Sequence, residues 1–116
     1  MKLFTKQQYN KLLSNGRKQA DAIEQGESLD FKPVVKLFNP TGVGTWLLSE
    51  IDPDYLDIAF GLCDVGYPEL GSVSISELEN FKGVLGLGIE RDLSFSPTKT
   101  LIEYSNQARE AGSLIA

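Results

Sequence analysis

Residues 43–64 read VGTWLLSEIDPDYLDIAFGLCD, and the rest of the chain is organised around them. Two apolar runs lie on either side of an acidic connector that contains neither Lys nor Arg. Pro53 ends the first run, because proline lacks the N–H that a strand ladder needs. Both runs have strand-forming composition, so we predict neighbouring strands over residues 43–52 and 57–64.

Side chains alternate between the two faces of a strand, which predicts what each face carries. In the first strand the alternation places Trp46, Leu48, Glu50 and Asp52 on one side and Leu47, Ser49 and Ile51 on the other. In the second it places Ile58, Phe60 and Leu62 opposite the small residues Ala59, Gly61 and Cys63. A small-residue face allows a close approach, by a packed helix or by a ligand.

The flanking sequence predicts three further extended segments. Residues 33–38 are joined to the central strands by turn residues 39–42, which indicates an antiparallel hairpin. Downstream we expect a short strand over 70–75, a helical turn over 76–79 capped by Ser76, and an extended segment over 84–95. In that last segment Gly86 and Gly88 would repeat the small-residue face.

Helical patterns are found near both ends. Thr5 and Gln8 fit a capping box, and an apolar stripe follows, with a kink or break expected at Gly16 and a stop near Gly26. A last helix is predicted from residues 96–98 to about Ala111, with Leu101, Tyr104, Ala108 and Ala111 inward. The expected fold is therefore α+β: one domain over 1–116, with about five largely antiparallel strands between two terminal helices.

Charge is distributed unevenly along the 116 residues, which carry a net charge of −5. Residues 1–20 contain five basic residues and no acid, and the remainder contains 6 basic and 16 acidic residues. No basic residue lies between Lys36 and Lys82. Such a block repels nucleic acid and attracts basic partners or cations, although a solvated surface that serves solubility is the commoner explanation.

Missing residue types exclude several kinds of chemistry. There is no His, so Ser-His-Asp and Cys-His catalysis and imidazole metal ligation are excluded. Cys63 lies within a predicted strand and is interpreted as a small packed side chain. The GxxGxG of residues 83–88 reverses the dinucleotide fingerprint and precedes no helix. We predict no cofactor, no resident metal and no catalytic residue, and no apolar run long enough to cross a membrane, which makes the cytoplasm the default location.

Our leading hypothesis is a non-enzymatic module that binds a basic protein surface through its acidic residues. The candidate partner-binding residues are Glu50, Asp52, Asp54, Tyr55, Asp57, Asp64, Glu69 and Arg91. Arg91 has two interpretations, an ion pair with a connector carboxylate or a ligand contact. One alternative is a hydrolase or nuclease-like enzyme whose divalent cation is held by Glu50, Asp52, Asp54, Asp57 or Asp64. Another is weak nucleic-acid binding through Lys2, Lys6, Lys11, Arg17 and Lys18.

Three longer strings carry a family resemblance: PVVKLFNPTGVGTWLLSEIDPD, IAFGLCDVGYPELGSVSISELE and GIERDLSF. With these strings the chain resembles a bacterial family catalogued as domain of unknown function 2958. Members of that family are often carried on plasmids and integrative conjugative elements. The resemblance covers nearly the whole chain and implies a stand-alone cytoplasmic protein or a module of larger mobile-element proteins. It implies an accessory role and brings no catalytic or binding residues with it.

Overall fold

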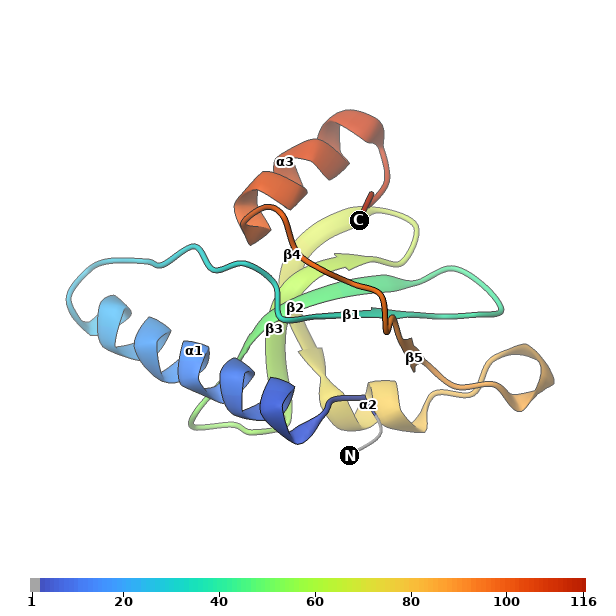
Figure 1. Cartoon of the computed structure of the whole chain (residues 1–116), viewed down its shortest axis with the longest axis horizontal. Helices are drawn as coiled ribbons and strands as arrows, with labels where there is room; N and C mark the ends of the chain where they lie inside the picture. The colour runs from blue at the N-terminus through green and yellow to red at the C-terminus, as the bar shows by residue number, and fades with distance from the viewer. Residues whose placement is uncertain (1–2) are drawn as a thin grey trace.

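A computed structural model describes residues 3–116. Its three helices, one 3₁₀ turn and five strands run in the order α1 (Lys6–Glu24), β1 (Val35–Phe38), β2 (Thr45–Ile51), β3 (Ile58–Asp64), β4 (Pro68–Ser74), α2 (Ile75–Asn80), η1 (Val84–Gly86), β5 (Glu90–Arg91) and α3 (Leu101–Ala111). The strands form one antiparallel sheet in the order β4-β3-β2-β1-β5. The predicted α+β fold, with a five-stranded sheet between N-terminal and C-terminal helices, is confirmed (Figure 1).

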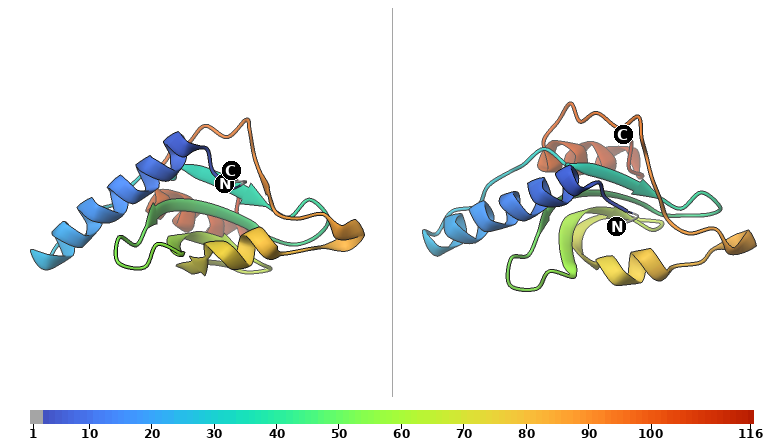
Figure 2. Two further views of the ribbon diagram at one scale, coloured as in Figure 1. Left: turned by 90° about the horizontal axis from the view of Figure 1, so that it is seen from below. Right: turned by 60° about the horizontal axis from the view of Figure 1, so that its bottom comes forward.

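The helices cover both faces of the sheet, giving three layers (Figures 1 and 2). On the α1 face the core contains Leu12, Val35, Trp46 and Leu48, and α2 contributes Ile75 and Leu78. On the opposite face α3 buries Leu101, Tyr104 and Ala108 against Leu47 and Leu62. The apolar residues on both sides of β2 are thus explained by its position between two helical layers.

A β-bulge at Ser49 changes the predicted alternation in β2. Leu48 pairs with Gly61 and Glu50 pairs with Phe60, so Ser49 is the extra residue. Beyond the bulge, each side chain of β2 points to the face opposite to the one that simple alternation predicts. Ile51 therefore joins Trp46 and Leu48 on the α1 face, and the prediction that it lies with Leu47 is wrong.

Helix α1 begins at the predicted capping box, because the Thr5 hydroxyl accepts from the Gln8 N–H and the Gln8 side chain accepts from the Thr5 N–H. The expected kink or break at Gly16 is wrong, because α1 is continuous from Lys6 to Glu24. Gly16 is instead a contact residue: a Cβ there would overlap the Ile51 carbonyl. The glycine lets the helix backbone approach the bulged end of β2.

Glycine also allows two strands to approach at Gly61. A Cβ at this position would overlap the Leu47 carbonyl of the neighbouring strand. The prediction that a helix or a ligand occupies the space over this small residue is therefore wrong at Gly61, because the β2 backbone itself fills it. Ala59 and Cys63 do face the α1 layer, where Ala59 is fully buried.

Several predicted boundaries are corrected by the structure. Only Glu90–Arg91 of the expected 84–95 segment forms a strand, and the glycines at 86 and 88 lie outside the sheet. The cap of α2 is Ser74 and not Ser76, and α3 begins after Thr100, which forms a capping box with Glu103. The predicted end of α3 is confirmed, since Gly112 closes it with a φ of 81°.

Candidate functional site

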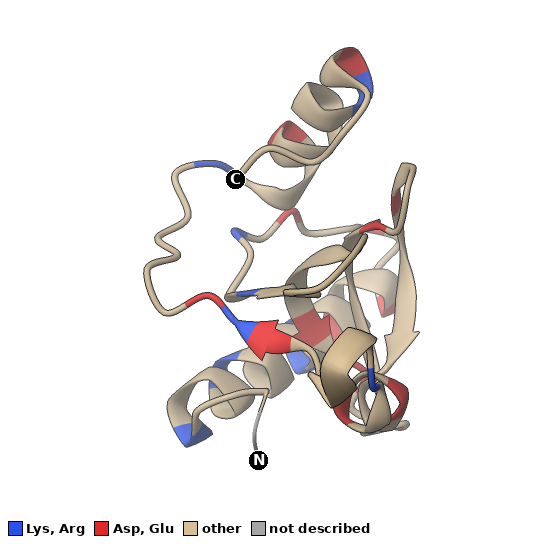
Figure 3. Ribbon diagram, turned by 90° about the vertical axis from the view of Figure 1, so that its right-hand side faces the viewer, with Lys and Arg blue, Asp and Glu red and all other residues tan. Residues whose placement is uncertain are grey.

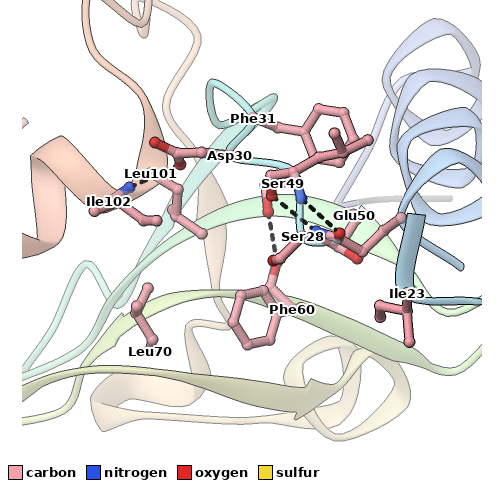
Figure 4. A pocket seen from close by; sticks show the side chains of 12 residues that line it. Ile23, Ser28, Asp30, Phe31, Ser49, Glu50, Phe60, Leu70, Leu101 and Ile102 are labelled. Atoms are coloured by element: carbon pink, nitrogen blue, oxygen red, sulfur yellow. Dashed lines mark hydrogen bonds between the residues drawn. The ribbon is translucent and has the colours of Figure 1, made fainter. Parts of the chain in front are cut away.

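A groove lies between α1 and α3 over one end of the sheet (Figure 4). Phe60 on β3 and Leu70 on β4 form its floor, and residues 28–31, which lie between α1 and β1, cross above them (Figure 4). Ile23 contributes the α1 wall, and Leu101 and Ile102 contribute the α3 wall. The cavity at the centre of this groove has a volume of about 340 Å³. Its size and apolar lining are typical of a binding pocket.

The α1 wall exists because α1 extends past the part of the sheet that covers it. Leu12 and Gly16 are buried, and Ile23 follows them at helical spacing on the same face. Ile23 is nevertheless 63% exposed. An apolar residue that continues the buried stripe, yet has no core residues over it, marks an open contact surface.

A second depression adjoins the groove, and acidic residues rim it. It shares Gln19, Ile23, Glu50 and Phe60 with the first cavity and extends to Asp52 and Asp54, with a volume of about 430 Å³. None of these three carboxylates forms an ion pair within residues 3–116. The connector is shaped locally, because the Asp52 carboxylate accepts the Asp54 N–H at 2.9 Å. The two depressions together are called the acidic groove below.

Glu50 stands in the wall that both depressions share. Burial raises the pKa of its carboxyl above the usual value, a hydrogen bond from Gln19 opposes the rise, and the nearby Asp52 adds to it. The Gln19 side-chain amide donates to Glu50 at 3.3 Å and to the Leu29 carbonyl at 2.9 Å. Gln19 thus links α1 and β2 to the segment between α1 and β1 at the centre of the acidic groove. The bulge at Ser49 sets the position of Glu50, because it shifts every later residue of β2.

Two other predicted residues of the connector are placed apart from the acidic groove lining. Asp57 accepts hydrogen bonds from the Ser74 and Ser76 hydroxyls and from the Ser76 N–H, at 2.7–2.9 Å. These bonds, the one from Ser74 foremost, lower the pKa of Asp57. Asp57 therefore holds the start of α2. Tyr55 is 70% exposed at the tip of the connector.

The remaining predicted residues lie elsewhere on the sheet. Asp64 is at the opposite end of β3 from the connector, where it accepts the Gly66 and Leu114 N–H groups. Glu69 is exposed on edge strand β4, and Arg91 lies on the other edge strand, opposite Leu37 of β1. Figure 3 shows acidic residues spread over several elements, not gathered in one patch. Of the eight predicted residues, the structure brings Glu50, Asp52 and Asp54 together.

The carboxylates that could serve a metal-dependent enzyme do not converge. Across residues 3–116, no three acidic or Cys side chains are close enough together to hold a metal ion. Cys63 is half-buried, and this burial, with the nearby Glu69, raises the pKa of its thiol to about 11. A thiol with so high a pKa is a poor nucleophile at neutral pH.

The basic residues of α1 lie on its solvent side. Lys6, Lys11, Arg17 and Lys18 are all exposed, and Lys2 lies outside the described residues. None of the helices within residues 3–116 is both long and apolar enough to cross a bilayer.

The sequence does not predict the apolar part of the acidic groove. Phe60 falls on one predicted face of β3, but nothing in the sequence indicates that this face lies open between two helices. One signal is present: Ile23 extends the apolar stripe of α1 by almost two turns past Gly16. An apolar stripe that continues along a helix beyond the sheet that covers it predicts an exposed apolar surface.

Comparison with known proteins identifies a family and no further relative. The family described as "Protein of unknown function (DUF2958)" matches residues 3–115. No curated protein and no solved structure matches the chain significantly. The match covers nearly every residue and agrees with the resemblance of the three strings quoted above. The chain therefore belongs to the DUF2958 family of proteins of unknown function.

Proposed function

We propose that this protein is a non-enzymatic interaction module whose acidic groove binds a segment of a basic partner protein. The observation that carries the proposal is that Ile23, 63% exposed in line with a buried stripe, lies beside Glu50, which forms no ion pair within residues 3–116. An apolar wall and a carboxylate rim select a segment with Lys or Arg close to an aliphatic or aromatic residue. In the mobile-element setting that the family resemblance implies, the partner is a protein that itself binds DNA through a basic surface.

Charge complementarity gives the groove its preference. A cation 4 Å from an exposed carboxylate gains about 1 kcal/mol in water, whereas at an effective dielectric constant of about 20 the gross gain is about 4 kcal/mol. Glu50 is half-buried, so it contributes more than Asp54, which is exposed. Asp52 and Asp54 extend the negative field and raise the association rate.

The apolar floor supplies the second part of the affinity. Burying an aliphatic side chain contributes about 1.5–3 kcal/mol, and Phe60 and Leu70 offer it a surface already held by the sheet. Binding hot spots commonly combine a central apolar anchor with a polar rim. The acidic groove has this arrangement, with the floor at its centre and the carboxylates at one side.

Display of a random peptide library tests the proposal even though the partner is unidentified. Selection on the native protein is expected to enrich peptides in which Lys or Arg lies within a few positions of an apolar residue. Selection on a Glu50→Gln, Asp52→Asn, Asp54→Asn variant is expected to lose this enrichment. Asp57 is left unchanged, because its hydrogen bonds to Ser74 and Ser76 hold α2 and its loss would confuse folding with binding.

A matched control removes three carboxylates away from the groove: Glu69→Gln, Glu79→Gln and Glu110→Gln, all exposed. This variant has the same change in net charge and is expected to select the same peptides as the native protein. If both variants lose enrichment equally, net charge and not the groove is responsible. If the groove variant retains it, the proposal is wrong.

A further inference from the structure

The turn at Val84–Gly86 holds a leucine in a conformation that leucine avoids. Leu85 has φ 64° and ψ 15°, and Gly86 follows with φ 73°. Within residues 3–116 Leu85 is the one non-glycine residue with positive φ. This left-handed conformation is sterically unfavourable for a residue with a Cβ. Strain of this kind is often found at functional positions.

The strained turn exposes apolar side chains and does not bury them. Leu85 is 88% exposed and Val84 is 65% exposed. A side chain so exposed has little contact with residues 3–116 that could compensate for the strain at Leu85. The turn projects at the end of a long excursion between α2 and β5 (Figure 1). We call residues 81–87 the apolar tip.

The apolar tip is held in place by its own backbone and by a neighbouring turn. The Gly83 N–H donates to the Leu87 carbonyl at 2.7 Å, closing the loop at its base. Thr41 of the β1–β2 turn lies close to Gly83. A Cβ added to Gly83 would be 2.6 Å from the hydroxyl oxygen of Thr41. A loop whose base is closed in this way has less backbone entropy to lose on binding.

The charge of the apolar tip is opposite to that of the acidic groove. Lys82 is exposed at its base, and no charged residue follows until Glu90. The segment thus contains one basic residue followed by valine and leucines. This is the chemistry that Glu50, Asp52, Ile23 and Phe60 would recognise.

The tip and the groove of one molecule are separated along its longest axis. In Figure 1 the tip is at the right, and the end of α1 that forms the groove wall is at the left; the views of Figure 2 agree. A tip can therefore reach a groove only on another molecule.

We propose that the apolar tip of one copy of this protein docks in the acidic groove of a second copy. Leu85 enters the cavity over Phe60, and Lys82 faces Glu50 and Asp52. The two surfaces are different, so the contact is heterologous and leaves one free tip and one free groove at the ends of each assembly. This inference rests on the acidic groove of the proposed function and names a second copy as its occupant, competing there with the basic partner.

Sedimentation velocity over a range of concentrations tests the proposal. The native protein is expected to show a sedimentation coefficient that rises with concentration. Leu85→Asp, which spoils the tip, and Ile23→Lys, which spoils the groove, are each expected to weaken self-association at least about tenfold. Leu93→Asp and Ile115→Lys change equally apolar, exposed positions outside both surfaces and are expected to behave as the native protein.

Mixing the two defective variants gives the sharper result. Leu85→Asp keeps an intact groove and Ile23→Lys keeps an intact tip, so an equimolar mixture is expected to form a dimer that cannot grow further. A native protein that sediments as a monomer at every concentration would overturn the proposal. A mixture of the two variants that remains monomeric while the native protein associates would also overturn it. Library selection that still depends on Glu50 would then leave the proposed function standing, so the two failures are distinguishable.

Discussion

The Asn15 side-chain amide of α1 donates a hydrogen bond of 2.9 Å to the Ser49 carbonyl at the bulge of β2. Both residues are buried. The bond joins the helix to the point where the alternation of β2 changes, and one residue later Glu50 enters the acidic groove. The fold and the candidate site are thus connected at one buried contact. The Asn15 Oδ1 has no hydrogen-bond partner within residues 3–116, so the amide N–H is the group through which this side chain makes the contact.

Replacing Asn15 by alanine is expected to destabilise the protein. The variant loses the buried hydrogen bond and the contacts of the amide, and gains slightly in helix propensity, for a net loss of about 1–2 kcal/mol. Urea unfolding followed by circular dichroism measures the change, with Asn106→Ala on the exposed side of α3 as the control. Equal stabilities for the two variants would show that the contact at the bulge is energetically unimportant.

Replacing Gly16 by alanine sets two effects against each other. Alanine favours the helix by about 1 kcal/mol, but its Cβ overlaps the Ile51 carbonyl, which is backbone and cannot move alone. Overpacking of this kind costs about 1–3 kcal/mol, and a backbone contact belongs at the upper end, so we expect a net loss of about 2 kcal/mol. Gly71→Ala is the control, because a Cβ there has open space. A more stable Gly16→Ala would contradict the close approach of α1 and β2.

Much of this architecture follows from the sequence because its signals are local. The capping box at Thr5, the β1–β2 hairpin and the glycine that ends α3 each depend on residues near in sequence. The bulge at Ser49 depends instead on residues distant in sequence, because it is favoured by Asn15 and Gly16 of helix α1. The predicted acidic site is incomplete for a similar reason. Asp52 and Asp57 are close in sequence, but their hydrogen bonds differ. Asp52 accepts the Asp54 N–H within the acidic connector, whereas Asp57 accepts the Ser74 hydroxyl at the start of α2.

Protonation of Glu50 gives a pH dependence to both stability and binding. The pKa of Glu50 is raised in the folded protein, so the folded state binds the proton more tightly than the unfolded state does. The free energy of unfolding therefore falls as pH rises from 4.5, the pKa in the unfolded chain, through the higher pKa in the folded protein. Glu50→Gln is expected to remove this fall and to be the more stable protein at pH 7. Thermal unfolding across pH 4–8 measures it. A basic peptide selected on the groove is expected to bind more tightly as pH rises through the same window; binding that weakens would contradict the role of Glu50.

Leu85 is expected to be replaceable without loss of stability. Asparagine tolerates the left-handed conformation better than leucine, so Leu85→Asn should stabilise the fold by about 1 kcal/mol, measured by chemical unfolding. Leu93→Asn, at a residue of similar exposure without positive φ, is expected to change stability by less than about 0.5 kcal/mol. Marked destabilisation by Leu85→Asn would mean that the leucine serves its own fold and not a contact with another molecule.

Site-specific photo-crosslinking in cells tests the acidic groove most directly. A photoreactive residue at position 23 faces the groove, and one at position 79 on α2 is exposed away from it. Binding of a basic partner in the acidic groove predicts discrete adducts at position 23 that disappear when Glu50, Asp52 and Asp54 are neutralised, and no such adducts at position 79. Equal adducts at both positions, or adducts at position 23 that persist in the neutralised variant, would contradict it.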